Sequence, residues 1–398
     1  SAPASLAAFL RGCRTRLALS EVAVVIGNEA ADADSIVSSI AHAYVCTQLR
    51  GTPACAYLPI GRRSLRSRRE TVTLLTEAGV EADDILTLDD VRPDEIPAHC
   101  KFILTDHNFP TSSFAGIEDR VTEIIDHHHD AGHCPHVTGD ARRIAFDNAK
   151  GAGIGSTCTL VAEELLRHPA SARDPRLSRL LLGVILVDTV NMDKAAKRAT
   201  ARDVAAVRAL EADIAATLVP SWSAAESTAM FERLNGAKFD RDFWRSLLPR
   251  DQLAMDYKQR QRAGVRYGLS AILIPFDDAL SAAGAEFWTQ CLEYMDEQHL
   301  DLLGVLTFVV SPSPARELVF CTRSDGSGLD DARWSSLLTR VASAEKLGLE
   351  EVATHTPPGL RAVHWRQRVV TSSRKQVMPV LDEALDGTQS EGAAESTV

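Results

Sequence analysis

The chain has 398 residues, 45% apolar and 24% charged, a composition that predicts a globular protein large enough for two separate cores. Its formal net charge of −11 argues against a broad nucleic-acid surface, because phosphate backbones are held by many Lys and Arg contacts. The sequence shows neither a membrane-length apolar run nor a secretory signal, so we expect a cytoplasmic protein with no membrane partner, although an organelle is not excluded.

The first half of the chain alternates short β-branched runs with longer amphipathic stretches, a pattern that predicts a mostly parallel sheet flanked by helices. Three runs are typical of buried strands, namely 22–26, 102–105 and 121–125. Each run leads into charged residues: Asp32 and Asp34, then Asp106, then Asp126 to His128. Open α/β sheets bind ligands beyond the carboxyl ends of their strands, so we expect these side chains to converge.

Helices are predicted to follow two of the polar segments. Apolar residues recur at helical spacing from Ile36 to Val45, so a helix should begin just after Asp34, where its dipole favours bound phosphate. The loop KGAGIGST at 150–157 places Gly155 and Ser156 before a second apolar helix. The run 177–187 is almost continuously apolar and fits either a buried helix or a strand, and it leads to Asp188.

Pro220 and two serines in VPSWS predict a linker at 213–228, which separates a first domain at 1–212 from a second at 229–385. The second domain has helical patterning at 231–257 and strand candidates at 271–274, 303–310 and 318–321. The small, acidic residues 386–398 predict a disordered tail. The eight cysteines are scattered without Cys-x-x-Cys spacing, so we expect reduced thiols and no structural disulfide.

The acidic and histidine segments have the composition of a divalent-cation site. Mg²⁺ and Mn²⁺ bind carboxylate oxygens and imidazole nitrogens, and four carboxylates beside a histidine pair suffice for a two-metal phosphate-cleaving site. Each segment also has an ordinary structural interpretation. Asp32 and Asp34 alone would be helix caps, His107 alone is equally well a core histidine, and the arginines at 62–69 alone would be a solvated helix face.

Six segments together carry a family resemblance: VVIGNEAADADS at 24–35, ILTDHN at 103–108, IIDHHHD at 124–130, GIGSTCTLV at 153–161, ILVDTVN at 185–191 and SSRKQVMP at 372–379. In this order they resemble the DHH phosphoesterase family, and within it the exopolyphosphatase and prune branch, close to family II pyrophosphatases. The resemblance implies an α/β fold with an N-terminal DHH domain, a smaller C-terminal DHH-associated α/β domain, and an active site in the cleft between them.

The resemblance also implies roles for particular residues. The expected metal ligands are Asn28, Asp32, Asp34, Asp106, His127 and Asp188. The expected catalytic residues are Asp106, His128, Asp188, Arg374 and Lys375. The expected substrate-binding residues are His128, Gly155, Ser156, Lys258, Ser373, Arg374 and Lys375, with Arg68 and Arg69 from the basic run. Asp126 is expected to orient a histidine ring, and Lys197, Thr200 and Asp203 to serve helix structure or outer contacts.

The activity implied is removal of terminal orthophosphate from inorganic polyphosphate by a monomer with two divalent cations, Mg²⁺ first and Mn²⁺ or Co²⁺ as alternatives. Asn28 occupies the position where family II pyrophosphatases carry a histidine ligand, which favours polyphosphate, including short chains such as tripolyphosphate, over pyrophosphate. The alternatives are a pyrophosphatase, a nucleotide phosphohydrolase or phosphodiesterase of the same family, and a prune-like binding protein without catalysis.

Overall fold

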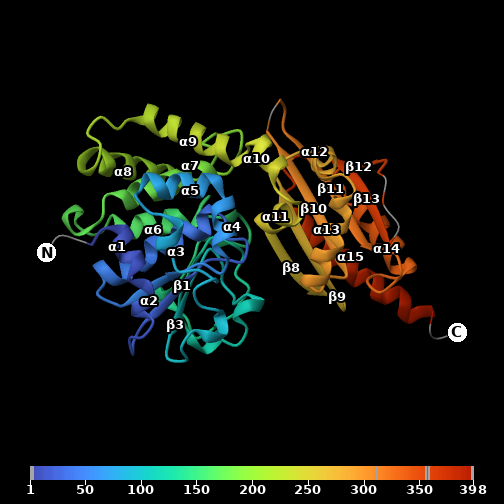
Figure 1. Cartoon of the computed structure of the whole chain (residues 1–398), viewed down its shortest axis with the longest axis horizontal. Coiled ribbons are helices and arrows are strands. Elements are labelled where there is room, and N and C mark those ends of the chain that lie inside the picture. The colour runs from blue at the N-terminus through green and yellow to red at the C-terminus, as the bar shows by residue number, and fades with distance from the viewer. Residues whose placement is uncertain (1–3, 311, 355, 357–358, 396–398) are drawn as a thin grey trace. The chain divides into compact units, whose positions relative to one another are not determined.

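The computed structural model describes residues 4–310, 312–354, 356 and 359–395. The chain forms two compact units, Ser1–Lys238 and Phe239–Val398, each with its own sheet and its own apolar core (Figure 1). Among the described helices, none combines the length and apolar character needed to cross a bilayer.

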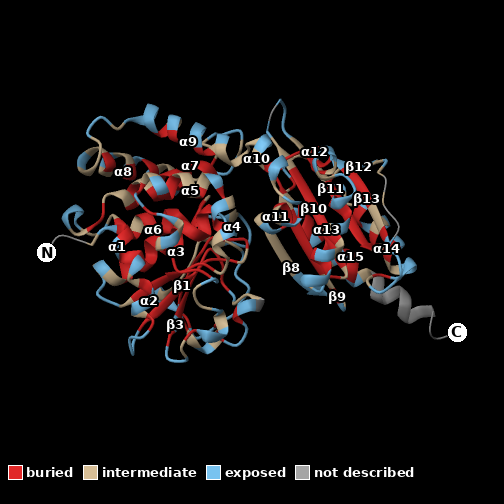
Figure 2. Cartoon of the chain, in the orientation of Figure 1, coloured by how far each residue is buried: buried red, intermediate tan, exposed pale blue. Residues whose placement is uncertain are grey.

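The first unit is built on a five-stranded sheet in the order β2-β1-β3-β4-β5, with every pair parallel. Its strands are β1 (Ala23–Ile26), β2 (Ala54–Tyr57), β3 (Lys101–Thr105), β4 (Val121–Asp126) and β5 (Arg142–Ile144). The three predicted strands are therefore confirmed as β1, β3 and β4. Their apolar residues are buried, as Figure 2 shows for the interior of this unit, because the sheet is covered by helices.

The longer helices of this unit are α3 (Ala33–Tyr44), α5 (Arg69–Glu77), α6 (Thr157–Leu165), α7 (Arg176–Asp188), α8 (Ala201–Thr217) and α9 (Ala224–Lys238). Helix α3 is confirmed but begins at Ala33, two residues earlier than predicted, because the Asp32 side chain accepts a hydrogen bond from the Ser35 backbone N–H and caps the helix. All twelve residues of α3 are buried, and its last turn continues into the π-helical segment η1 (Val45–Leu49).

Helix α7 resolves the ambiguity of the apolar run at 177–187. Ten of its thirteen residues are buried, because α3, α6, α8 and α9 all pack against it. A helix surrounded by other helices is apolar all round, so its sequence shows no amphipathic period. Asp188 is the last residue of α7, and the helix therefore brings this carboxylate out of the apolar core.

Short elements complete the first unit: α1 (Leu6–Arg11), α2 (Cys13–Arg16), α4 (Arg62–Ser67), η2 (Ala82–Asp84), η3 (Pro93–Glu95), η4 (Ser112–Phe114), η5 (Glu118–Arg120), η6 (Gly139–Ala141), η7 (Ala170–Ala172), and the two-stranded ribbon of β6 (Phe146–Asp147) and β7 (Gly151–Ala152). The cysteines of both units are buried free thiols.

The second unit is built on a six-stranded mixed sheet in the order β12-β13-β11-β10-β9-β8. Its strands are β8 (Tyr257–Arg262), β9 (Val265–Ile272), β10 (Leu302–Val309), β11 (Ala315–Arg323), β12 (Leu349–Val352) and β13 (Leu360–Gln367). Its helices are α10 (Arg241–Ser246), α11 (Pro249–Met255), α12 (Phe276–Ala283), α13 (Glu286–Glu297), α14 (Asp331–Ala342) and α15 (Arg374–Glu395). Only β9 and β10 pair in parallel.

Both faces of this second sheet are apolar. Leu302 and Leu306 of β10 belong to one core with α14 and α15, whereas Leu303 and Val305 belong to another with α12 and α13. Alternate residues of a strand point to opposite faces, so the two cores lie on opposite sides of the sheet. The strand prediction at 318–321 falls within β11, the one at 303–310 covers β10 except its first residue and extends one residue beyond it, and 271–274 overlaps only the end of β9.

The helical patterning predicted at 231–257 is divided among α9, α10 and α11, and Tyr257 already begins β8. Leu248 before Pro249 is extended, which separates α10 from α11. The predicted linker at 213–228 includes the end of α8 and the start of α9. The predicted tail at 386–398 falls mostly outside the residues whose side chains the structure describes.

Candidate metal centre

The predicted acidic residues converge at the carboxyl edge of the first sheet. The register aligns Ile26 with Leu104 and Leu104 with Ile124, so the residues that follow β1, β3 and β4 are neighbours in space. The N-termini of α3 and α6 meet at the same edge, because Asp34 of α3 accepts hydrogen bonds from residues 156–158.

Asp106 lies at the middle of this group. Its backbone is left-handed, with φ of +61°, a conformation that costs a non-glycine residue free energy and is often found at functional sites. Its Oδ2 accepts hydrogen bonds from Asn28 Nδ2 and Ser35 Oγ, both at 2.7 Å, and its Oδ1 accepts one from Thr157 Oγ1 at 3.2 Å. The carboxylate is 2% exposed and is therefore fixed in one orientation.

Asp34 is held by the N-terminus of α6. Its carboxylate accepts hydrogen bonds from Ser156 Oγ at 2.7 Å, from the Thr157 backbone N–H at 2.7 Å and from the Cys158 backbone N–H at 2.9 Å. These donors favour the charged carboxylate, as helix N-termini generally do. Burial, and after it the carboxylates of Asp106 and Asp32, nevertheless raise the pKa of Asp34 well above its ordinary value.

His127 faces both of these aspartates through one ring nitrogen. Its Nδ1 lies 3.2 Å from the Ile154 carbonyl oxygen, so Nδ1 carries the proton and Nε2 presents a lone pair. Nε2 lies 3.5 Å from Asp106 Oδ1 and 3.9 Å from Asp34 Oδ2. Separations of this size are those of ligand atoms around one shared cation, for which metal–ligand bonds are about 2.0–2.2 Å.

Asp126 organises the loop that carries the histidines. Its Oδ1 accepts hydrogen bonds from the backbone N–H of His127 at 2.7 Å and from His128 Nδ1 at 2.8 Å, and its Oδ2 accepts one from Asn108 Nδ2 at 2.6 Å. Burial would raise the pKa of Asp126, but the hydrogen bond and charge of His128 hold it well below its ordinary value. Asp126 thus orients the His128 ring, the role predicted for it.

Asp188 has a buried carboxylate oxygen that a cation would stabilise. Its Oδ2 is buried and has no hydrogen-bond partner among the described residues. Burial, followed by the carboxylates of Asp34 and Asp32, raises the pKa of Asp188 well above its ordinary value. A buried carboxylate oxygen without a partner is costly, and a divalent cation would satisfy it. The donor set of Asp34, Asp106, His127 and Asp188 therefore fits hard divalent cations.

Two other predicted metal ligands, Asp32 and Asn28, have hydrogen-bonding roles in the fold. Asp32 is exposed and caps α3, and its charge acts on both Asp34 and Asp188. Asn28 is buried, and its Oδ1 accepts hydrogen bonds from the backbone N–H groups of Ala30 and Ala31, at 2.9 and 3.3 Å. The Asn28 amide nitrogen points to Asp106. In this arrangement Asn28 orients a carboxylate, and its role as a metal ligand stays a prediction.

The glycine-rich loop is fixed by a residue that lies far along the chain. The Gly155 backbone N–H donates to Asp203 Oδ2 at 2.9 Å, and Asp203 also forms a capping box with Thr200 at the start of α8. A Cβ on Gly155 would lie 2.7 Å from the Arg198 carbonyl oxygen, so only glycine fits. Thr200 and Asp203 thus serve helix structure, as predicted, and Ser156 reaches both Asp34 and Asp188.

Arg68 differs from its predicted substrate contact. It is 2% exposed, and its guanidinium donates to the carbonyl oxygens of Ala30 and Ala31, at 2.7 and 2.6 Å, and to Ser64. Arg69, the next residue, is exposed. Elsewhere in the basic run, Arg62 pairs with Asp90 and Arg66 with Asp83. Arg68 therefore holds the loop before Asp32, and much of the predicted basic surface is neutralised by aspartates.

In the second unit, the predicted phosphate-binding residues lie near one end of β8. Arg374 Nη1 donates to the Asp256 carbonyl oxygen at 2.9 Å, and its Nη2 pairs with the Asp256 carboxylate, two residues before Lys258. Ser373 caps the start of α15 together with Gln376, and Lys375 is exposed. The chain thus brings Lys258 and Arg374 to one strand from positions more than a hundred residues apart.

Sequence reasoning did not single out two residues that support this centre. Ser35 donates to Asp106, and Asn108 links Asp126 to the His129 carbonyl oxygen at 2.9 Å. Both lie within the motifs quoted above, next to the acidic residues. Their roles depend on side chains 71 and 18 residues away, and only the fold makes those contacts visible.

Two family models match the chain. The model for the N-terminal domain of the DHH family matches residues 22–189, and the DHHA2 domain model matches residues 233–384. The mouse protein named exopolyphosphatase PRUNE1 is 30% identical over 95% of this chain and 78% of its own length. A putative exopolyphosphatase from Schizosaccharomyces pombe is 28% identical over 91% of this chain and 90% of its own length.

More distant relatives are named pyrophosphatases. A probable manganese-dependent inorganic pyrophosphatase from Deinococcus radiodurans is 31% identical over 42% of this chain and 46% of its own length. The crystal structure of a putative family II inorganic pyrophosphatase from Methanococcus jannaschii matches with a TM-score of 0.58 and 19% identity, and covers 92% of this chain and 100% of its own. This last match shows the fold alone.

Together with these relatives, the parallel sheet with its acidic carboxyl edge and the separate second unit define a two-domain hydrolase whose fold is of the α/β class. The chain belongs to the DHH family, in the branch that includes the exopolyphosphatases of the prune type. The predicted family and fold class are thereby confirmed.

Proposed function

We propose that the protein is a metal-dependent exopolyphosphatase that releases orthophosphate from the end of inorganic polyphosphate. The observation that supports this most strongly is the convergence of Asp34, Asp106, His127 and Asp188, because the buried Oδ2 of Asp188 has no hydrogen-bond partner in the described part of the chain. A non-catalytic binding protein has no need of such a costly arrangement, because unpaired buried carboxylates destabilise the fold.

Asp32, Asp34, Asp106, His127 and Asp188 would hold two divalent cations, Mg²⁺ in the first place, with Mn²⁺ or Co²⁺ as substitutes. When bound, such cations neutralise phosphate charge and lower the pKa of a coordinated water, which supplies a nucleophile at neutral pH. Asn28 and Ser35 fix Asp106 by hydrogen bonds, so its Oδ1 keeps one direction throughout the reaction.

His128 would hydrogen-bond the phosphate that is transferred. Its Nδ1 is bonded to Asp126, so Nε2 is the ring nitrogen that can reach a substrate oxygen, and the side chain is 27% exposed. The buried Asp126 keeps the ring in one orientation, as a carboxylate does for a catalytic histidine. Gly155 and Ser156 would contribute at the N-terminus of α6, where the helix dipole favours phosphate oxygens.

We further propose that Lys258, Ser373, Arg374 and Lys375 bind the phosphate chain and stabilise charge on the leaving phosphate. Arg69 remains a candidate for the distant part of the chain, because it is exposed, whereas Arg68 is committed to the loop at Ala30 and Ala31. The net charge of −11 supports inorganic polyphosphate over nucleic acid as the partner, and we propose a cytoplasmic monomer.

Pyrophosphate is the second candidate substrate, favoured by the match to a manganese-dependent pyrophosphatase over the first domain. Asn28 argues against it, since the family II pyrophosphatases carry histidine at this position. The two substrates differ in length only, so the same centre could cleave either.

Orthophosphate release from pyrophosphate, tripolyphosphate and long-chain polyphosphate tests the proposal, with Mg²⁺, Mn²⁺ or Co²⁺ and with EDTA as a control. Metal-dependent release from tripolyphosphate or longer chains, with pyrophosphate intact, is the expected result. Cleavage of pyrophosphate alone would favour the second candidate, and no release from any of the three would overturn hydrolysis of inorganic phosphoanhydrides. Asp34→Ala and Asp106→Ala should abolish release while the far-ultraviolet circular dichroism stays unchanged.

A further inference from the structure

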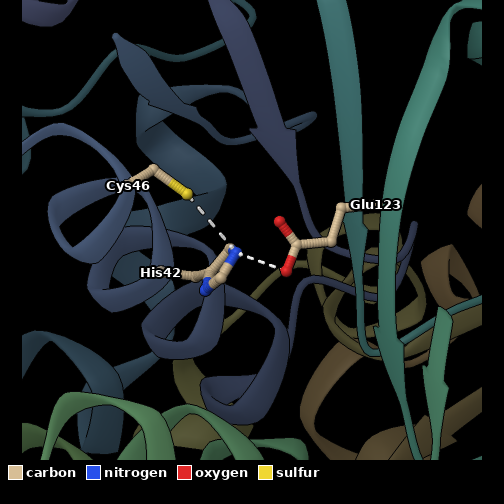
Figure 3. Close-up of side chains that lie close together, drawn as sticks. All are labelled: His42, Cys46 and Glu123. Atoms are coloured by element: carbon tan, nitrogen blue, oxygen red, sulfur yellow. Dashed lines mark hydrogen bonds and ion pairs between the residues drawn. The ribbon is translucent and has the colours of Figure 1, made fainter. Parts of the chain in front are cut away.

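A second cluster of ligand-type side chains lies in the first unit, away from the acidic edge of the sheet. His42 in the last turn of α3, Cys46 in η1 and Glu123 in β4 converge (Figure 3). His42 is fully buried, Cys46 is 1% exposed and Glu123 is 9% exposed. Glu123 is near the amino end of β4, whereas Asp126 ends the same strand, so this cluster and the candidate metal centre are distinct.

We propose that His42, Cys46 and Glu123 form a zinc site, separate from the cations of the hydrolytic centre. The donor set of imidazole, thiolate and carboxylate is one that zinc binds in proteins, whereas Mg²⁺ does not take thiolate ligands. Nothing in the proposed hydrolysis uses these three residues.

The distances within the cluster support a tetrahedral ion. His42 Nε2 lies 3.5 Å from Cys46 Sγ and 3.3 Å from Glu123 Oε1. A zinc ion with bonds of about 2.3 Å to sulfur and about 2.0 Å to nitrogen and oxygen places these atom pairs about 3.6 and about 3.3 Å apart. One nitrogen atom therefore meets both partners at the separations that a tetrahedral site requires, and the three donor atoms all lie within 4.8 Å of one another.

The second nitrogen of His42 also fits this interpretation. His42 Nδ1 is buried, has no hydrogen-bond partner among the residues that the structure describes, and lies 3.9 Å from Glu164 Oε2. Zinc-bound histidines usually donate their other N–H to a carboxylate, which fixes the ring and strengthens the ligand. A small rotation of the ring toward Glu164 would complete that bond when Nε2 binds an ion.

The helix geometry brings the ligands to one side. His42 and Cys46 are four residues apart, the spacing that places two side chains on one helix face, and Cys46 lies in the π-helical segment η1. A pocket of about 380 Å³, lined in part by Cys46, Arg50, Thr122 and Glu123, adjoins the cluster. It offers an entry path and a place for water as the fourth ligand.

Two arginines set the charge balance. Arg50 and Arg143 pair with both Glu123 and Glu164, and these guanidinium groups oppose the approach of a cation. An ion that enters must therefore compete with these guanidinium groups for Glu123, while His42 and Cys46 supply the two other ligand atoms. Zinc binds histidine as the neutral ring and cysteine as the thiolate, so binding releases the protons that these ligands carry and should tighten as the pH rises.

The test uses the whole protein in an Asp34→Asn/Asp106→Asn background, which weakens the hydrolytic centre and leaves the zinc cluster intact. After incubation with Zn²⁺ and dialysis, elemental analysis should find about one zinc per chain. Co²⁺ as the probe should give a thiolate charge-transfer band in the near ultraviolet. Adding Cys46→Ser should remove both signals, whereas Cys158→Ser, a buried cysteine next to Asp34, should keep them.

X-ray absorption of the wild-type protein, loaded with one equivalent of Zn²⁺ in excess Mg²⁺ so that the hydrolytic centre holds Mg²⁺, gives a measurement that needs no substitution. One sulfur in the zinc shell, lost in Cys46→Ser, is the expected result. A shell of nitrogen and oxygen only, or a charge-transfer band that survives Cys46→Ser, would overturn the site and leave His42 as a buried imidazolium between two glutamates. Orthophosphate release is a separate assay, so failure of the zinc site and failure of the proposed hydrolysis remain distinguishable.

Discussion

At the scale of single residues, the carboxylates of the candidate centre repel one another, and a bound cation would offset that repulsion. Asp34, Asp106 and Asp188 are brought together with little solvent, and burial raises the pKa of Asp34 and of Asp188. Such sites lower the stability of the metal-free protein and bind divalent cations more tightly as a result.

Asp188→Asn tests this balance. In EDTA the substitution removes a buried charge, so the melting temperature of the first unit should rise, by about 2–4 °C for each 1 kcal/mol gained. Added Mg²⁺ should then stabilise the variant less than the wild type, and phosphate release should fall about 100-fold or more. Calorimetry with and without Mg²⁺ measures the first two effects. Asp193→Asn, an exposed neighbour, should change none of them, and a lower metal-free melting temperature in Asp188→Asn would contradict the argument.

Arg68 provides a second residue-scale test, because it acts on the centre through the backbone. Its guanidinium fixes the carbonyl oxygens of Ala30 and Ala31, and Ala31 has a left-handed φ of +45°. Lysine cannot bond both carbonyl groups in this fork geometry. Arg68→Lys should weaken Mg²⁺ activation about 10- to 100-fold, measured as the cation concentration for half-maximal phosphate release. Arg208→Lys, at an exposed position of α8, is the matched control, and equal effects in both variants would count against a positioning role.

At the scale of elements, the close approach of the glycine-rich loop to α8 determines whether α6 can present its N-terminus to Asp34. Gly155→Ala would place a Cβ 2.7 Å from the Arg198 carbonyl oxygen and 2.7 Å from Thr189 Cγ2, so the loop must shift. We expect loss of stability of about 1–3 kcal/mol and loss of phosphate release. Gly236→Ala in α9 meets nothing within 4 Å and should instead stabilise the protein by about 0.5–1 kcal/mol, as urea unfolding of both variants would show.

A carboxylate that joins several elements of the second unit gives a pH prediction. Glu317 accepts hydrogen bonds from the Phe276 backbone N–H at 2.8 Å and Thr307 Oγ1 at 3.2 Å, and it lies 3.1 Å from His364 Nε2. Burial would raise the pKa of Glu317, but the hydrogen bond of His364 and these other donors lower it from 4.5.

A lowered pKa means that this carboxylate stabilises the fold above pH 4.5, its ordinary value, and that the stabilisation is lost as the pH falls through the folded-state pKa. Glu317→Gln should therefore be less stable than the wild type at neutral pH, and the difference should narrow in acid. Denaturant unfolding at a series of pH values measures this. For Glu351→Gln, an exposed position of β12, the free energy of unfolding should change with pH as it does in the wild type. A loss of stability in Glu317→Gln that is the same at every pH would refute the linkage.

At the scale of the whole molecule, the two units have separate sheets and separate cores, so cations at the first should act on the first alone. Hydrogen exchange with Mg²⁺ should slow in peptides covering 23–36, 103–108, 124–130, 153–159 and 185–190. Peptides from β10 and β11 of the second unit should exchange at unchanged rates. Equal slowing in both units would contradict a local effect of the cations on the first unit.

The sequence alone determined the strands β1, β3 and β4 of the first unit, and it placed an acidic or histidine motif after each of them. β1, β3 and β4 are mostly apolar stretches that each precede a polar motif, so local patterning was sufficient for them. The buried strand β2 precedes no such motif and was not predicted. The same patterning could not distinguish helix from strand at 177–187, because a helix packed on every side has no polar face to reveal its period.

Only the tertiary structure decided which groups the side chains of the motif residues contact. Asn28 donates a hydrogen bond from its amide nitrogen to Asp106, and Asp126 orients His128. Arg68 donates its hydrogen bonds to backbone carbonyl groups. His42 and Glu123 meet although 81 residues separate them in the sequence. Hydrogen bonds and ligand geometry depend on distances of a few ångströms between distant parts of the chain, and residue spacing along the sequence does not contain those distances.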